Sequence, residues 1–224
     1  MKTKLISIVV ICLFSLTYAS AQRQAGKSSF AVLGGVNFQN LTGKDYSGDK
    51  LENKMITGFH VGANVQIPLV PEFYFQPGIL FSTKGGKYEE NSITNTTRLS
   101  YIEVPLNFMY KGMLGTGYVF LGLGPYIGYA VMGKVKYESG SDSQKKDIEF
   151  QNVVEPDEPL TVPYAKAFDM GGNIFFGYEM ALGLFAQLNA QLGLVKINPE
   201  YESLPDDESV VKNTGFGLSL GYRF

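Results

Sequence analysis

The last residues of the chain alternate strictly between large apolar side chains and small or polar ones. Counting back from the C-terminus, the apolar positions are Phe224, Tyr222, Leu220, Leu218 and Phe216. The positions between them are Arg223, Gly221, Ser219, Gly217 and Gly215. Successive side chains of a β-strand point to opposite faces, so this segment predicts a strand with one apolar face. Such a face lies inside a soluble barrel or sandwich, but it points into lipid in an outer-membrane barrel.

Seven earlier segments alternate in the same way, and strands of their length are long for a soluble protein. They cover residues 29–39, 56–67, 72–84, 99–110, 117–131, 164–179 and 181–195. Long connections (41–55, 85–98, 132–163 and 199–212) alternate with short ones (68–71, 111–116 and residue 180). Outer-membrane barrels gather long loops at one end and tight turns at the other. We therefore expect an all-β, eight-stranded antiparallel up-and-down transmembrane β-barrel with both termini in the periplasm.

The N-terminal segment has the order of a secretory signal peptide. Lys2 and Lys4 precede an apolar run from Leu5 to Tyr18, and the A-x-A cleavage site Ala19-Ser20-Ala21 follows. The run is short for a transmembrane helix. We expect residues 1–21 to be the signal peptide and residues 22–224 to form one barrel domain. The chain's single cysteine lies within the segment that would be removed.

The charge balance argues against a nucleic-acid partner. The chain has 19 basic and 21 acidic residues, and removing Lys2 and Lys4 would leave 17 basic residues and a net charge of −4. Proteins that bind nucleic acid need a basic surface to neutralise phosphates.

The composition of the second strand face favours lipid outside over a secreted, lipocalin-like barrel. That face carries Gly, Tyr, Asn, Gln and Ser rather than the Lys and Glu of a solvated surface. Inside a narrow barrel, glycine would leave room for Tyr74, Tyr101, Tyr118 and Tyr126. Aromatic residues near the ends of the apolar face predict interfacial girdles, namely Phe30, Phe73, Phe81, Tyr110, Tyr129, Tyr178, Tyr222 and Phe224.

Five runs carry a resemblance to a known family. They are YFQPGILFSTKGG, YIEVPLNFMY, YVFLGLGPYIGY, FDMGGNIFFGYE and LFAQLNAQLGLVKIN. These runs resemble the PorT-like outer-membrane β-barrel domain of Bacteroidetes over nearly all of residues 22–224. The resemblance implies a small eight-strand barrel, similar in plan to the OmpX and OmpA type, in the outer membrane of a Gram-negative bacterium. The family's namesake supports protein secretion, but barrel motifs alone do not carry that role over to this chain.

His60 is the only histidine, and its strand parity places it on the lumen face. One interpretation makes it the base of a barrel acyl hydrolase or acyltransferase, which needs a serine nucleophile and an orienting acid nearby. No serine stands at a motif-like spacing from it, so an interior, hydrogen-bonding histidine is the favoured interpretation.

The alternation also places five charged residues on the lumen face: Lys84, Glu103, Asp169, Glu179 and Arg223. Charges in a narrow barrel must pair, because isolated burial is costly. We favour a structural polar network, including His60, that fills the lumen; the alternative is a proton or ion path. The acidic clusters at 45–49 and 206–208 lack the ligand spacing of a calcium loop, so we expect no metal and no cofactor.

These observations predict an outer-membrane protein with a structural or surface-interaction role, which presents four exterior loops on a largely filled barrel. We expect no enzyme activity. The alternatives are a lipid-modifying enzyme that uses His60, a narrow solute pore and an accessory of protein secretion. The expected partners are outer-membrane lipid, a surface partner of the loops, and the barrel-assembly machinery, which would read Tyr222 and Phe224 as a C-terminal signal. We expect a monomer.

Overall fold

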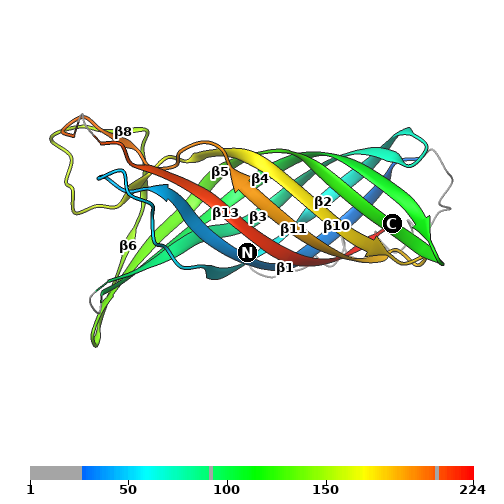
Figure 1. The fold of residues 1–224 in the computed structure, drawn as a ribbon, viewed down its shortest axis with the longest axis horizontal. Helices are drawn as coiled ribbons and strands as arrows, with labels where there is room; N and C mark the ends of the chain where they lie inside the picture. The colour runs from blue at the N-terminus through cyan, green and yellow to red at the C-terminus, as the bar shows by residue number, and fades with distance from the viewer. Residues whose placement is uncertain (1–26, 91–92, 205–206) are drawn as a thin grey trace, which may run out of the picture.

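The computed structural model describes residues 27–90, 93–204 and 207–224, so the expected signal peptide lies outside the described residues. Eight strands form a closed antiparallel ring (Figure 1). They are β1 (Ser29–Lys44), β2 (Ile56–Val70), β3 (Phe73–Glu90), β4 (Ile93–Leu114), β5 (Gly117–Ser139), β10 (Phe168–Glu179), β11 (Leu184–Gly193) and β13 (Val210–Arg223). Within the described ranges, no helix is long and apolar enough to cross a membrane.

The seam between the first and last strands closes the ring. β1 and β13 pair from Ala31↔Arg223 to Lys44↔Val210, and the Phe224 amide donates to the Phe30 carbonyl at 2.8 Å. β5 and β10 are separated by the longest connection in the chain, and they pair from Tyr129↔Phe168 to Tyr118↔Glu179. Closure leaves no strand edge of the ring unpaired, which is the condition for a sheet in lipid. The expected eight-stranded up-and-down barrel is confirmed.

The apolar face points outward. Mid-strand Phe108 and Leu220 expose 58% and 60% of their surface, whereas Tyr126 on the other face is fully buried. The outward band ends toward the long connections at polar side chains, among them Thr42 and Thr214, whose hydroxyls lie 3.0 Å apart. Aromatic pairs stand near both ends of the band: Phe73 with Tyr110 at one end, and Phe38 with Phe216 at the other. This is the pattern of a lipid-facing surface with interfacial aromatic residues.

The sheet continues beyond the apolar band, where the sequence predicts loops. β3 and β4 stay paired as far as Glu90↔Ile93, so most of the expected loop 85–98 is a β-ribbon. β5 likewise runs to Ser139, and β6 (Asp142–Asp147) folds back along it. The β3–β4 extension is largely polar on both faces and gives no alternation to recognise. From Lys134 onward, β5 has only Val135 and Tyr137 as apolar residues, and they face inward rather than toward lipid.

One tight turn is longer than expected. The sequence predicts a turn at Met180 alone, but the chain turns over residues 180–183 between β10 and β11. The Gly183 amide donates to the Met180 carbonyl at 2.9 Å, and Gly183 has a φ of +100°, which glycine adopts most easily. A single residue cannot reverse an antiparallel pair.

The connections between β6 and β10 and between β11 and β13 fold into an ordered cap at the same end as the β5–β6 ribbon (Figure 1). β7 (Glu149–Phe150) pairs with β9 (Tyr164–Ala165), and β8 (Val153–Val154) pairs with β12 (Glu200–Tyr201), both in parallel. The cap is joined to the barrel by backbone bonds, such as Ile197 N–H to Val211 O at 2.8 Å. Tyr164 and Ala165 therefore belong to the cap, and β10 begins at Phe168 rather than at residue 164 as the sequence predicts.

Candidate functional site

The inward side chains fill the lumen in layers between the end with the tight turns (the turn end) and the end with the cap (the loop end). The inward residues of β4 mark the order of the layers: Lys111, Met109, Asn107, Glu103 and Tyr101. They belong in turn to a charged cluster, an aromatic layer, a polar cavity, a second charged cluster and an apolar plug.

Glu179 is the centre of the charged cluster at the turn end. Its Oε2 accepts from Lys111 Nζ at 2.7 Å and from Arg223 Nε at 3.2 Å. The Arg223 guanidinium also donates to Asn64 Oδ1 at 3.1 Å and lies 5.7 Å from the centre of the Phe185 ring. Sequence parity finds Glu179 and Arg223, but Lys111 falls in an expected turn and is missed.

Three phenylalanines form the layer above this cluster. Phe120 lies 6.2 Å from Phe175 and 6.1 Å from Phe185, centre to centre, and Met109 and Leu33 complete the packing. A glycine makes room for the Phe185 ring: a Cβ added at Gly221 would lie 2.2 Å from it. Glycines therefore make room for phenylalanines in the lumen as well as for tyrosines. Strand alternation does not single out these phenylalanines.

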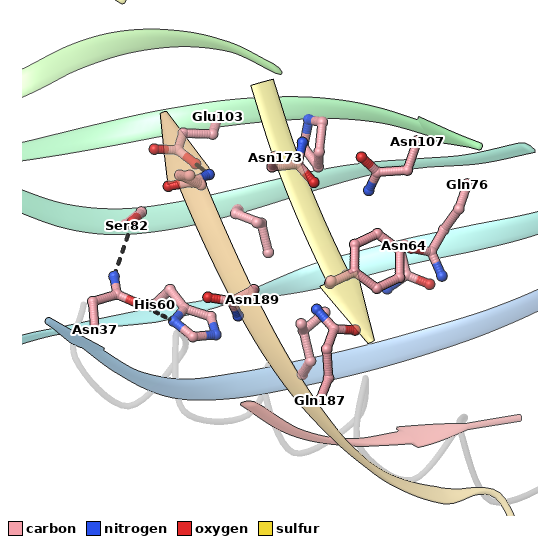
Figure 2. Close-up of a pocket in the computed structure, with 16 residues that line it drawn as sticks. Asn37, His60, Asn64, Gln76, Ser82, Glu103, Asn107, Asn173, Gln187 and Asn189 are labelled. Carbon is pink, nitrogen blue, oxygen red and sulfur yellow. Dashed lines mark hydrogen bonds between the residues drawn. The ribbon is translucent and has the colours of Figure 1, made fainter. Parts of the chain in front are cut away.

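His60 belongs to a hydrogen-bonded network above the aromatic layer (Figure 2). Its Nδ1 lies 2.5 Å from Asn37 Oδ1, and its Nε2 lies 2.7 Å from Ser219 Oγ. Asn37 Nδ2 donates to Ser82 Oγ at 3.1 Å, which leaves Asn37 Oδ1 as the acceptor for His60 Nδ1–H. His60 Nε2 therefore accepts the Ser219 hydroxyl proton, and Ser219 Oγ accepts from Asn189 Nδ2 at 2.9 Å. The tautomer of neutral His60 that is protonated at Nδ1 gives each of these hydrogen bonds one donor and one acceptor.

This network has the connectivity of a nucleophile, a base and an orienting amide, which the spacing of serines in the sequence does not reveal. Ser219 lies 159 positions from His60 and comes to it through closure of the ring. Ser219 is, however, fully buried, and Asn189 already donates to its oxygen. An ester carbonyl must come within about 3–3.5 Å of a nucleophile to react, and Ser219 offers it no free approach.

The cavity beside His60 is small and lined chiefly by carboxamides. Its volume is about 60 Å³, and its lining includes Asn37, Asn64, Gln76, Asn107, Asn173, Gln187, Asn189 and Gln191 (Figure 2). A cavity of this size with polar walls accommodates a few water molecules. Asn107 Oδ1 is buried without a partner among the described residues, and such a water can satisfy it.

Lys84 is the centre of the second charged cluster. Its Nζ lies 2.7 Å from Glu103 Oε1 and 3.1 Å from Asp169 Oδ2, and all three side chains are buried. The ammonium also lies 4.1 Å from the centre of the Tyr126 ring, a cation–π contact. Asp169 Oδ2 accepts from Tyr126 and Asn213, and Glu103 Oε2 accepts from Gln191. The expected charged residues therefore fall into two separate clusters rather than one network.

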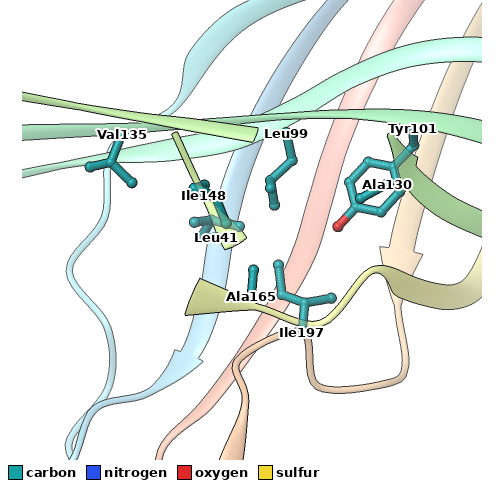
Figure 3. Close-up of a cluster of buried hydrophobic side chains, with 8 residues drawn as sticks. All are labelled: Leu41, Leu99, Tyr101, Ala130, Val135, Ile148, Ala165 and Ile197. Atoms are coloured by element: carbon teal, nitrogen blue, oxygen red, sulfur yellow. The ribbon is translucent and has the colours of Figure 1, made fainter. Parts of the chain in front are cut away.

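An apolar plug closes the loop end of the lumen. Leu41, Leu99, Tyr101 and Val135 of the strands pack against residues of the connections (Figure 3). These partners are Ile148, Ala165 and Ile197. The lumen thus holds two apolar layers, one at each side of its polar middle. Among the described residues, no group of three or more His, Cys, Asp or Glu side chains is placed to hold a metal ion.

A closed ring of long tilted strands, apolar outside and filled inside, defines a small up-and-down outer-membrane β-barrel. The chain belongs to the family described as the outer membrane protein beta-barrel domain, whose model matches residues 20–198. The protein is therefore located in the outer membrane of a Gram-negative bacterium, in contact with its lipid.

Several solved structures are similar to this chain. They include Ail, the attachment invasion locus protein of Yersinia pestis, in complex with the heparin analogue sucrose octasulfate (15% identity, 88% of this chain and 99% of that chain, TM-score 0.44). Neisserial surface protein A matches at 11% identity, 88% of this chain and 99% of that chain, with a TM-score of 0.45. OprG from Pseudomonas aeruginosa matches at 10% identity, 89% of this chain and 97% of that chain, with a TM-score of 0.40. None of the curated proteins with which the sequence was compared matches it.

Proposed function

We propose that this barrel is a non-conducting scaffold that presents its loop end at the cell surface for interaction with a partner. The observation that carries the proposal is the filled lumen, in which two apolar layers interrupt any aqueous path between the ends. Ion passage through an apolar layer is strongly unfavourable. The ordered cap and the polar ribbons provide a surface with which a partner can interact.

The two rival functions fit the geometry less well. A lipid-modifying enzyme would use His60 with Ser219, but neither side chain is reachable from the lipid-facing surface, because both are buried in the lumen. A solute pore would need a continuous path, and the cavity of about 60 Å³ is far below the 300–1,000 Å³ typical of small-molecule sites.

We also propose how the chain is exported and assembled. Residues 1–21 act as a cleaved signal peptide, residues 22–224 form the barrel domain, and the assembly machinery reads Tyr222 and Phe224. The PorT-like resemblance is retained as a finer proposal for the family, and an accessory role in secretion is a further alternative that no feature of the site favours. The barrel works as a monomer in this proposal, and its ring is complete within one chain.

Labelling of single cysteines on intact cells tests the orientation. Cys12 is the only cysteine of the chain and would leave with the signal peptide, so an introduced cysteine is unique. A membrane-impermeant maleimide should label Ser143→Cys, in the β5–β6 ribbon, on intact cells. Thr116→Cys, in the tight turn between β4 and β5, is the matched control and should react only after the outer membrane is permeabilised. The reverse pattern would contradict surface presentation of the loop end.

A further inference from the structure

A hollow of about 340 Å³ lies in the cap, at the outer side of the apolar plug. Strands β1, β4, β5 and β13 supply one part of its wall, and the connections between β6 and β10 and between β11 and β13 supply the rest. This volume falls within the range of small-molecule sites and holds a ligand of one or two rings. The hollow is separate from the cavity beside His60, with which it shares no lining residue.

Three tyrosines from separate segments gather around the hollow. They are Tyr137 of β5, Tyr164 of β9 and Tyr201 of β12. Burial raises the pKa of Tyr201, and the Asp207 carboxylate raises it further. The phenols of Tyr164 and Tyr137 contribute in the same direction, so both lie within electrostatic range of Tyr201. The Tyr201 phenol is therefore neutral and able to donate at pH 7.

The hollow is held in shape by backbone hydrogen bonds rather than by side chains alone. The Gln151 amide donates to the Ala165 carbonyl at 2.9 Å, and the Lys166 amide donates to the Ile197 carbonyl at 2.7 Å. The ion pair of Lys166 with Glu200, at 3.0 Å, links the same two connections. A site that is ordered before its ligand arrives avoids the cost of ordering on binding.

The chemistry of the wall limits the ligand. None of the lining side chains is charged, so a charged ligand would lose its hydration without gaining a counter-ion. The floor is aliphatic, formed by residues such as Leu41, Ile148 and Ile197, and would leave the many hydroxyls of a sugar unpaired. A plain acyl chain, in turn, would leave the amides and phenols of the rim without partners.

One polar group in the wall of the hollow lacks a hydrogen-bond donor within the part of the chain that the structure describes. Asn95 lines the hollow, and its Oδ1 is buried with no hydrogen-bond partner among the described residues. Thr97, two positions further along β4, also lines the hollow. An aromatic ring with one N–H or O–H group meets each of these conditions, because its face can pack on tyrosines and aliphatic side chains while its donor pairs with the Asn95 amide oxygen.

We propose that the hollow is a binding site for an uncharged aromatic ring that carries one hydrogen-bond donor. Indole and phenol rings have this chemistry, and they can come from a free small molecule or from a Trp or Tyr side chain of a polypeptide. The inference rests on the proposed surface role, because it supplies the chemistry with which the cap recognises its partner.

Fluorescence titration of the full-length mature barrel in lipid nanodiscs tests this site. The chain contains no Trp, so emission excited at 295 nm reports on an indole probe with little background. The probes are indole, N-acetyltryptophanamide and 1-methylindole, each corrected with empty nanodiscs. We expect saturable, blue-shifted emission for indole and about tenfold weaker binding for 1-methylindole, which lacks the N–H donor.

Substitutions in the wall of the hollow test whether the probe binds there. Tyr201→Ala removes one aromatic wall and should weaken indole binding about tenfold. Ala165→Leu adds volume inside the hollow and should do the same, so one variant that fails to fold leaves the other. Tyr88→Ala is the matched control, because Tyr88 lies on the β3 ribbon and does not line the hollow. It should bind like the unmodified protein.

The outcomes separate the sources of the ring and the two proposals. Binding of both indole and N-acetyltryptophanamide supports a side chain of a polypeptide, whereas binding of indole alone supports a free small molecule. The inference is overturned by no binding of either probe, by equal binding of 1-methylindole, or by displacement with methyl glucoside. If binding fails while Ser143→Cys is still labelled on intact cells, only the hollow's role is lost. If labelling fails, the surface role falls as well.

Discussion

Lys84 is a buried cation in the lumen that pairs with two carboxylates. Its ammonium contacts the buried carboxylates of Glu103 and Asp169. Removing one partner of a buried ion pair leaves charge without compensation, whereas removing all partners together can be nearly neutral. We therefore expect Lys84→Met to lower the free energy of unfolding by about 3–5 kcal/mol. Adding Glu103→Gln and Asp169→Asn should recover most of the loss.

Urea-induced unfolding of the barrel in lipid vesicles measures this effect. Lys134→Met is the control, because Lys134 forms an exposed ion pair with Asp147 and should change stability little. A triple variant less stable than Lys84→Met alone would show that the cluster is not held by its charge balance.

Leu188 tests which face of the sheet meets lipid. It lies near the middle of β11, opposite Phe176 and Leu218, and 47% of its surface is exposed. Leu188→Arg should cost about 2–4 kcal/mol of folding free energy in a bilayer if the side chain is near the midplane. Gln187→Arg, one position away in the lumen, should act by steric crowding instead. Full tolerance of the Leu188→Arg substitution in vesicles would place the apolar face elsewhere.

At the scale of elements, β13 both closes the barrel against β1 and carries the C-terminal residues proposed as the assembly signal. Deleting Tyr222 to Phe224 removes the Phe224–Phe30 backbone bond, the Arg223–Glu179 pair and the stacked ring contacts of Phe224. We expect the truncated chain to cross the inner membrane and then to accumulate in the periplasm or be degraded. Phe224→Ala keeps the strand pairing and should be milder. Cell fractionation distinguishes the forms, and normal outer-membrane levels of the truncated chain would argue against both roles of the terminus.

The cap is the element whose stability should respond to acid. The Lys166 ammonium donates to Glu200 and holds the pKa of that carboxyl below its ordinary value. A carboxyl with a lowered folded-state pKa stabilises the fold above its unfolded-state pKa and loses that contribution as pH falls through the folded-state value. The β8–β12 pair should therefore open more readily below about pH 4. Hydrogen exchange at the Glu202 amide, which donates to the Val154 carbonyl at 3.1 Å, measures this opening. Glu200→Gln should remove the pH dependence.

Sequence periodicity predicts which face each strand residue occupies, but not which residues meet across the lumen. Lys84, Glu103 and Asp169 are placed on the inner face by parity alone, and so are Glu179 and Arg223. Their division into two clusters depends on strand tilt and stagger, which set the height of each residue and are not encoded in alternation. The contact of His60 with Ser219 has the same origin, since these residues lie on β2 and β13, which do not pair with each other. The cap is unpredicted because its short strands carry no repeating pattern.

At the scale of the whole molecule, planar-bilayer conductance measures whether the filled lumen blocks the passage of ions. Barrels purified from membranes and inserted one at a time should show no discrete channel steps above the bilayer background in 1 M KCl. An engineered path is the positive control. Replacing Phe120, Phe175 and Phe185 with Ala opens the aromatic layer, and replacing Leu99, Tyr101, Ile148 and Ile197 with Ala together with removal of cap residues 149–165 opens the apolar plug, so this variant should produce steps. We expect no channel steps from the unmodified barrel and regular steps from the variant. Regular single-channel steps from the unmodified protein would contradict it.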